Sequence, residues 1–234
     1  MKILVFDTET TGLPERNALI TDHNKWPHVM QLSYIYFDIS QNRILNKVDV
    51  LIKIADDVEI SEKSIEIHGI SREQSKARGI DIKEALREFN VYLKSADVIV
   101  GHNIEFDKKL LMVEFGRNKI FHNFYVNRVK KAEYCTMKNS IDLCKLTYPP
   151  KIDSMDANII ADANIIVDPN KPIRYKYPKL VELYIYLFNY TPNNLHDAMI
   201  DVLICLRCYC VMAHRFDIFR NNTEIVELFK SYDV

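Results

Sequence analysis

The sequence has almost no net charge, with 31 lysines and arginines against 32 aspartates and glutamates. The chain as a whole is therefore not a strong attractor for polyanions, and any surface of that kind must be local. The five cysteines are odd in number and lack the spacing of a disulfide framework. No apolar run is long enough to cross a bilayer, and the first residues do not form a charged-then-apolar targeting segment. We therefore expect a reducing compartment, the cytoplasm or the nucleus, and no contact with a membrane.

The sequence also lacks the motifs that mark several large enzyme classes. It has no Walker loop, no glycine fingerprint of dinucleotide-binding folds and no nucleophile elbow. Its 234 residues, 48% of them hydrophobic, are enough to bury a core as one domain. We predict that this domain covers residues 1–215, with an insertion near 148–178, and that residues 216–234 form a tail or an extra helix.

The most informative segment is an apolar strand that ends in two acids. Ile3 to Phe6 are apolar without interruption, which is typical of a strand buried on both faces. Asp7, Thr8 and Glu9 follow. Because side chains two apart on a strand point to the same face, the two carboxylates project together and Thr8 turns away. Such carboxylates repel each other unless a cation neutralises them, so we interpret the pair as half of a metal site.

Strands and helices alternate along the first half of the chain. Apolar, β-branched and aromatic residues predict strands at 29–37, 46–54 and 97–100, the second of them antiparallel to its partner and half exposed. A capping box at Ser71 predicts a helix start, and Asp81 is expected to cap a longer helix. Strands followed by helices, with acids at the strand ends, predict an α/β fold whose site lies at the carboxyl edge of the sheet.

A second acidic cluster follows the strand at 97–100. Asn103 is a candidate N-cap for a helix running to about Phe115, which places Glu105 and Asp107 in its first turns. Helical rotation separates these two acids, so we do not expect both to face one site. An acid near a helix N-terminus also has an ordinary explanation, because it interacts favourably with the helix dipole.

The third cluster lies in the segment 195–201, at the start of another helix. The buried stripe predicted for this helix consists of Met199, Val202, Leu203, Leu206, Cys210 and Ala213. Asp201 borders the stripe, and a buried carboxylate needs a partner or a metal. His196 precedes it in the loop or first turn, whereas Asp197 lies one turn before it on the same face. Spacing alone does not choose between His196 and Asp197 as its functional companion.

Together, the three clusters resemble the motifs of the DEDD exonuclease superfamily. The order and internal spacing of Asp7-Thr8-Glu9, of Asp107 and of His196 followed by Asp201 match that superfamily over roughly residues 1–213. Because its third motif contains a histidine, the sequence resembles the branch of the superfamily to which polymerase proofreading subunits belong. Residues 67–70 resemble the family segment near the terminal nucleotide, and residues 179–184 resemble the helix before the third motif.

The resemblance implies a ribonuclease H-like mixed sheet flanked by helices, and metal-dependent removal of nucleotides from a 3′ end. Asp7, Glu9, Asp107 and Asp201 would hold two Mg²⁺ ions, which favour oxygen ligands, and Mn²⁺ could replace them. His196, rather than Asp197, would act as general base on the attacking water. Two cations about 4 Å apart neutralise the phosphodiester, activate water and stabilise the departing 3′ oxygen.

The expected substrate is nucleic acid with a single-stranded 3′ end. By the same resemblance, Thr10, Gly12, Leu13, His68 and Asn103 would contact the terminal nucleotide, with Leu13 wedged against a base. Two basic stretches are candidates for phosphate contacts: Lys108, Lys109, Arg117, Lys119, Arg128, Lys130 and Lys131 in the first, and Lys171, Arg174, Lys176 and Lys179 in the second. We interpret the insertion near 148–178 as a lid, a DNA-contacting loop or a small hairpin.

DNA is the leading substrate, and RNA is the alternative, because discrimination of the 2′-hydroxyl depends on details of the pocket. A third hypothesis is a non-catalytic polymerase-associated subunit of the same fold, against which the intact acids and His196 argue. A polymerase partner would need a docking segment, for which residues 216–234 are the candidate. Three cysteines share one predicted helix and diverge around its axis, so we interpret them as core residues: Cys205, Cys208 and Cys210.

Overall fold

A computed structural model describes residues 1–148, 174–193 and 196–232 of the chain. The insertion predicted near 148–178 therefore lies almost entirely outside the described residues. Among the described residues, no helix is both long enough and apolar enough to cross a membrane.

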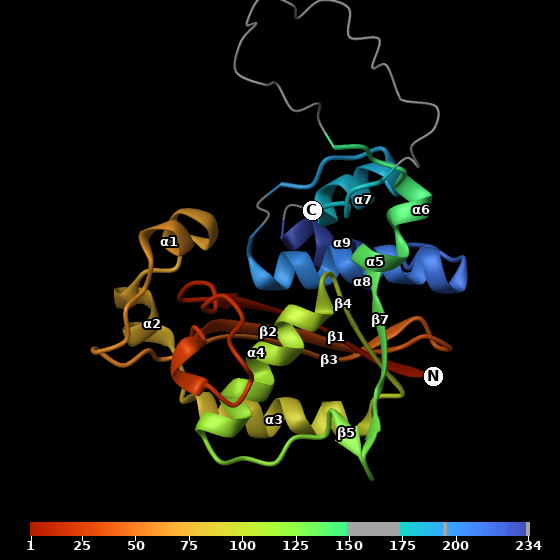
Figure 1. The fold of residues 1–234 in the computed structure, drawn as a ribbon. Helices are drawn as coiled ribbons and strands as arrows, with labels where there is room; N and C mark the ends of the chain where they lie inside the picture. The colour runs from red at the N-terminus through yellow and green to blue at the C-terminus, as the bar shows by residue number, and fades with distance from the viewer. Residues whose placement is uncertain (149–173, 194–195, 233–234) are drawn as a thin grey trace, which may run out of the picture.

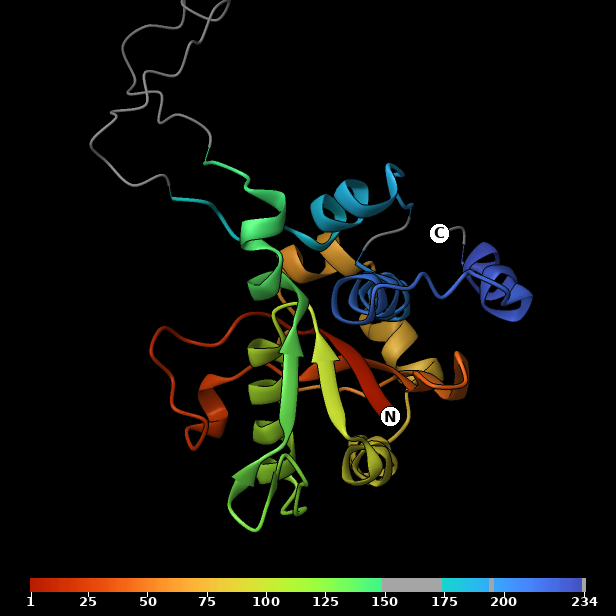
Figure 2. The ribbon, with the colours of Figure 1, turned by 90° about the vertical axis from the view of Figure 1, so that its right-hand side faces the viewer.

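A five-stranded mixed sheet organises the fold, in the order β3-β2-β1-β4-β7. β1 (Lys2–Thr10) occupies its centre and pairs in antiparallel fashion with β2 (Val29–Asp38), which pairs in the same way with β3 (Arg43–Leu51). On the other side, β4 (Val98–Gly101) runs parallel to β1, and β7 (Ala132–Cys135) runs parallel to β4 (Figure 2). The mixed sheet predicted from the sequence is confirmed.

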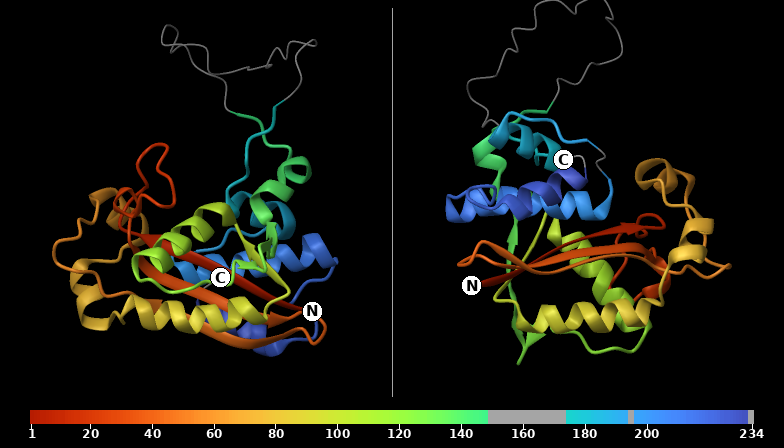
Figure 3. Two further views of the ribbon diagram at one scale, coloured as in Figure 1. Left: turned by 60° about the horizontal axis from the view of Figure 1, so that its bottom comes forward. Right: turned by 180° about the vertical axis from the view of Figure 1, so that it is seen from behind.

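Helices cover both faces of this sheet, and the alternation of β1 side chains divides the core between them. Leu4 and Phe6 pack on the side of α3 (Ile82–Ser95) and α4 (Ile104–Arg117). Ile3 and Val5 pack on the opposite side, against α8 (Ala198–His214). Figure 1 shows α8 above the sheet and α3 below it, and the view from behind in Figure 3 shows the same layers. The burial on both faces predicted for residues 3–6 is therefore confirmed.

Side-chain caps place several helices where the sequence predicts them. α2 (Arg72–Arg78) begins with the capping box at Ser71, and Asp81 caps α3 by accepting a hydrogen bond from the backbone of Lys83. The preceding α1 (Glu62–His68) was not predicted, although Ser61 caps its first turn. Gly69 ends α1 in the left-handed conformation, with φ of 69°, which glycine adopts without steric cost.

Two boundary predictions need correction. Asn103 stands at the N-cap position of α4, but its backbone is left-handed and its side chain makes no capping hydrogen bond. It serves the tight turn between β4 and α4, a conformation that asparagine tolerates better than most residues. The strand predicted at 46–54 is β3, which starts and ends earlier, because it must remain in register with β2 across the hairpin.

Helix α8 (Ala198–His214) is buried on more than one side, whereas the sequence predicted a single buried stripe. One face packs on the sheet, and Ile204 and Cys208 pack against α7 (Leu180–Phe188) on another. Ala213, placed in the predicted stripe, is exposed near the end of the helix. The burial predicted for Cys205, Cys208 and Cys210 is confirmed.

The C-terminal segment contains α9 (Thr223–Ser231), whose Ile225 and Phe229 are buried in the core shared with α8. The apolar face of this helix is therefore occupied within the chain. The remaining described elements are short: η1 (His23–Lys25), β5 (Tyr125–Val126), β6 (Val129–Lys130), α5 (Thr136–Asn139) and α6 (Ile141–Cys144).

Candidate active site

Three carboxylates meet where β1 ends and α8 begins. Asp7 and Glu9 lie on the face of β1 that packs on α8, and Asp201 lies in the first turn of that helix. One carboxylate oxygen from each of the three residues lies within 4.8 Å of the other two. The shared direction predicted for Asp7 and Glu9 is confirmed by this convergence.

Burial and mutual repulsion hold these carboxyl groups far from their ordinary acidity. Burial raises the pKa of Asp7 well above its usual value, and the neighbouring Asp107, Asp201 and Glu9 raise it further. Burial raises the pKa of Glu9 to about 8, with added repulsion from Asp201 and Asp107. Burial likewise raises the pKa of Asp201 to about 7. A divalent cation relieves this repulsion, and its preference for oxygen ligands fits the donors present.

Asp107 stands beside this group and is held by a residue that the sequence did not single out. Its carboxylate is only 4% exposed and accepts a hydrogen bond of 2.7 Å from the hydroxyl of Thr8. Burial raises its pKa to about 7, and the Thr8 hydrogen bond opposes that rise. Thr8 thus turns away from Asp7 and Glu9, as expected, but from there it orients the fourth acid.

Glu105, the other acid near the start of α4, is engaged elsewhere. It forms ion pairs with Lys109 at 2.8 Å and with Lys138 at 3.0 Å. Hydrogen bonds from these two lysines lower the pKa of Glu105 to about 2. The prediction that Glu105 and Asp107 face different surroundings is confirmed.

The two candidates in the third cluster have different surroundings. The carboxylate of Asp197 caps α8, accepting hydrogen bonds from the backbone of Met199 at 2.9 Å and of Ile200 at 3.3 Å. His196 is exposed, and its backbone N–H hydrogen-bonds the Asp201 carboxylate. A positive φ of 71° at His196 sharpens the turn into the helix. His196 is therefore exposed with its backbone next to Asp201, whereas the carboxylate of Asp197 is engaged in capping α8.

A cavity of about 920 Å³ opens next to Glu9. Four of the five predicted substrate residues line it: Thr10, Gly12, Leu13 and His68. Leu13 is 84% exposed, so its side chain is accessible to a ligand in the cavity. The hydroxyl of the buried Thr10 donates to the carbonyl of Gly12 at 2.7 Å, which fixes the turn that presents Leu13. Asn103, the fifth, is exposed but is not among the lining residues.

The backbone occupies both ring nitrogens of His68. Nδ1 accepts a hydrogen bond from the N–H of Ile70 at 3.0 Å, so Nε2 carries the proton and donates to the Thr10 carbonyl at 3.1 Å. Burial lowers the pKa of His68, which favours this neutral form. The ring therefore ties the end of α1 to the end of β1 and offers a substrate its carbon surface.

Arg117 and Glu114 of α4 hold another wall of the cavity. Sequence reasoning named Arg117 only as a candidate phosphate contact and gave Glu114 no role. Arg117 donates to the carbonyls of Pro27 at 2.8 Å, His23 at 2.5 Å and Trp26, all on the loop between β1 and β2. Its partner Glu114 is buried, pairs with Arg117 at 2.7 Å and accepts from the backbone of Val29. The sequence shows that these two charged residues are three apart, but it does not show which backbone carbonyls Arg117 contacts.

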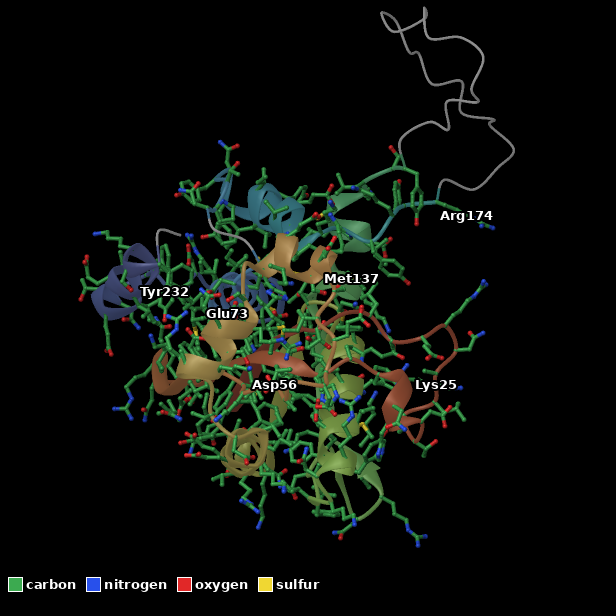
Figure 4. The ribbon with its side chains drawn as sticks, turned by 90° about the vertical axis from the view of Figure 1, so that its left-hand side faces the viewer. Lys25, Asp56, Glu73, Met137, Arg174 and Tyr232 are labelled. Atoms are coloured by element: carbon green, nitrogen blue, oxygen red, sulfur yellow. The ribbon has the colours of Figure 1, made fainter. Side chains whose placement is uncertain are left out.

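Phosphate binding by the first basic stretch stays a prediction, and several of its members are engaged within the chain. Arg117 is used in the loop just described, and Lys108 is buried in an ion pair of 2.7 Å with Glu133. Lys109 pairs with Glu105. Lys25 and Lys63 line the cavity, and Lys25, on the connection between β1 and β2, is labelled in Figure 4. Arg174, also labelled there, does not line it.

Comparison with known proteins agrees with this architecture. Exonuclease I of E. coli, in a zinc-bound complex with single-stranded DNA, superimposes with a TM-score of 0.63 at 17% sequence identity, over 94% of this chain and 42% of that one. Its complex with a dT13 oligonucleotide gives a TM-score of 0.63 at 17% identity, over 97% and 45% of the two chains. This chain therefore spans less than half the length of exonuclease I. No curated protein sequence matches it.

The ribonuclease H-like fold expected from the three motifs is confirmed by this structural likeness. Membership in the branch with a histidine in the third motif stays a prediction. A family model described as exonuclease, RNase_T, matches residues 4–209, which is most of the chain. The chain therefore belongs to the RNase_T exonuclease family, within the DEDD superfamily.

Proposed function

We propose that the chain is a metal-dependent 3′→5′ exonuclease that hydrolyses phosphodiester bonds at the 3′ end of DNA and releases nucleoside monophosphates. The observation that carries this proposal is the convergence of Asp7, Glu9 and Asp201 beside an open cavity, in a chain of this exonuclease family. The cavity lies at the end of β1, where the substrate would meet the carboxylates.

Asp7, Glu9, Asp107 and Asp201 are the proposed ligands of two Mg²⁺ ions, which Mn²⁺ can replace. Once bound, such ions neutralise the phosphodiester, generate a nucleophile from water and stabilise the departing oxygen. The pKa of Glu9, which burial and the neighbouring acids raise to about 8, supports this assignment. Thr8 supports the set by holding Asp107 in one orientation.

His196 is the proposed general base. The residue is exposed, and its backbone N–H hydrogen-bonds the Asp201 carboxylate, which fixes the backbone of His196 next to a proposed ligand. Imidazole accepts a proton readily near neutral pH, which suits removal of a proton from the attacking water.

The cavity is the proposed site for the terminal nucleotides. Thr10 and Gly12 shape the turn that exposes Leu13, whose apolar side chain is placed to pack against a base. His68 contributes ring surface rather than a hydrogen bond, because both of its nitrogens are already engaged. Asn103 is retained as a contact for the nucleotide from its exposed place at the start of α4.

The test is degradation of 5′-labelled single-stranded DNA, double-stranded DNA and RNA by the purified protein, with Mg²⁺, Mn²⁺ or chelator. We expect a ladder of products that shorten from the 3′ end of single-stranded DNA, lost with chelator and in Asp7→Ala. Shortening of RNA alone would replace DNA with RNA as the substrate. If no polymer is shortened with either metal, the proposal fails, and a non-catalytic role replaces it.

A further inference from the structure

A row of polar side chains runs across the sheet next to the carboxylates. The register of β1 and β2 places Gln31 directly opposite Glu9 and Ser33 directly opposite Asp7. Ser33 in turn lies opposite Asp49 of β3. Residues directly opposite each other on neighbouring strands point to the same face, so this row shares the α8 side of the sheet with the proposed metal ligands.

Gln31 connects this row to the first residue of α8. It is buried, with 5% exposure, and its side-chain oxygen accepts a hydrogen bond of 3.3 Å from the backbone N–H of Ala198. The next two backbone N–H groups of the helix are capped by Asp197. Gln31 therefore satisfies the first backbone donor within this helix, and it does so from the sheet.

Asp49 determines which way the amide of Gln31 faces. One oxygen of Asp49 accepts from the Gln31 side-chain nitrogen at 2.8 Å and from the Ser33 hydroxyl at 2.7 Å. A carboxylate only accepts hydrogen bonds, so it requires the NH₂ group of Gln31 on its side. The amide oxygen is thereby directed toward Ala198.

We propose that Gln31, oriented by Asp49, is a positioning residue that fixes the start of α8 so that Asp201 meets Asp7 and Glu9. The inference rests on the proposed metal site and goes beyond it. Asp201 lies three residues after Ala198, on a different element from Asp7 and Glu9. One carboxylate oxygen of each of these three acids lies within 4.8 Å of the other two, so their like charges repel and favour displacement of α8 from the sheet. The Gln31–Ala198 hydrogen bond opposes this displacement at the point where it would alter the site.

The first readout is binding of the metal itself, independent of catalysis. We would measure the rise in melting temperature as Mg²⁺ or Mn²⁺ is added to the wild type and to Gln31→Leu, which keeps the side-chain volume but removes both hydrogen bonds. We expect Gln31→Leu to need roughly tenfold more metal, the lower end of the effect of residues that orient ligands. The half-saturating metal concentration for DNA cleavage should rise in parallel, with KM for DNA unchanged.

A double-mutant cycle tests the role of Asp49. Asp49→Ala alone should weaken metal binding less than Gln31→Leu does. Asp49→Asn should bind metal better than Asp49→Ala, because its amide oxygen can still accept from Gln31. In the Gln31→Leu background, Asp49→Ala should cause no further loss of metal binding. Additive effects would overturn the claim that Asp49 acts through Gln31.

Ser75→Ala is the matched control for simple loss of stability. Ser75 is buried on α2, bonded to the backbone of Ile52 and Ile54, and does not line the cavity. It should lower the melting temperature without changing the metal midpoint. If Gln31→Leu behaves in the same way, the positioning role is overturned while the metal site stands. A wild type whose melting temperature does not respond to metal would instead overturn the metal site, and this inference with it.

Discussion

At the scale of single residues, the defining feature of this protein is a set of half-buried or buried acids that form no ion pair with any described lysine or arginine. Asp7, Glu9, Asp107 and Asp201 all have raised pKa values, with burial as the first cause in each case. An arrangement that costs stability in the free protein is typical of a site selected for binding a cation.

We therefore expect the metal-free protein to lose stability as the pH rises from about 5 to about 8. The pKa of Glu9 is about 8 in the folded chain, against an ordinary value of 4.5. Between these values the folded state binds more protons than the unfolded state, so unfolding becomes easier with rising pH. The measurement is melting temperature against pH in chelator.

Saturating Mg²⁺ should flatten this dependence, and Glu9→Gln should reduce it without metal. A pH profile that is the same with chelator, with Mg²⁺ and in Glu9→Gln would contradict the assignment of these acids to a cation site.

Thr8 offers a second test at this scale. Thr8→Val keeps the shape of the side chain but leaves the buried Asp107 carboxylate without its hydroxyl donor. We expect a loss of about 1–3 kcal/mol in the free energy of unfolding, measured by urea denaturation without metal. Thr8→Ser retains the hydroxyl and should lose much less, and equal losses in the two variants would show that the hydrogen bond is not the cause.

At the scale of elements, the wall of the cavity depends on α4 as much as on the loop that forms it. Arg117 and Glu114 join this helix to the loop between β1 and β2 through several backbone groups. Arg117→Met would leave the Glu114 carboxylate buried without its partner, and breaking such a pair typically costs about 3–5 kcal/mol. We expect a clear fall in melting temperature and a KM for DNA that rises more than kcat falls.

Lys109→Ala is the control on the same helix, because its ion pair with Glu105 is solvent-exposed and contributes little. An Arg117→Met protein that unfolds no more easily than Lys109→Ala would show that the loop holds itself in place.

The sequence predicted the elements whose signals are local. The apolar run of β1, the Ser71 capping box and the Asp81 cap each lie within a few residues of the structure that they specify. Strand alternation predicted the shared direction of Asp7 and Glu9, whereas Asp201 was joined to them only by the family resemblance. The contacts of Arg117 and Gln31 could not be predicted, because their partners lie on other elements and no periodicity reports which carbonyl or N–H a side chain will meet. The capping hydrogen bond expected of Asn103 is absent for a related reason. The tight turn before α4 gives this residue a left-handed backbone, although asparagine otherwise favours helix caps.

At the scale of the whole molecule, the site lies where two layers of helices meet one sheet edge. α4 supplies Asp107 from one face, α8 supplies Asp201 from the other, and β1 supplies Asp7 and Glu9 between them. This placement follows the general rule that α/β folds bind their ligands beyond the carboxyl ends of strands. The positions of α4 and α8 relative to β1 must therefore be fixed for the four acids to act together.

The most direct test is the initial rate of release of the 3′-terminal nucleotide from single-stranded DNA, measured against Mg²⁺ concentration in the wild type and in Asp7→Asn, Glu9→Gln, Asp107→Asn and Asp201→Asn. We expect metal-dependent release by the wild type and, in every variant, a rate reduced by more than the roughly 10–100-fold that loss of a supporting residue costs. Near-wild-type release by any of the four folded variants, or release that persists in chelator, would contradict the joint role of these carboxylates.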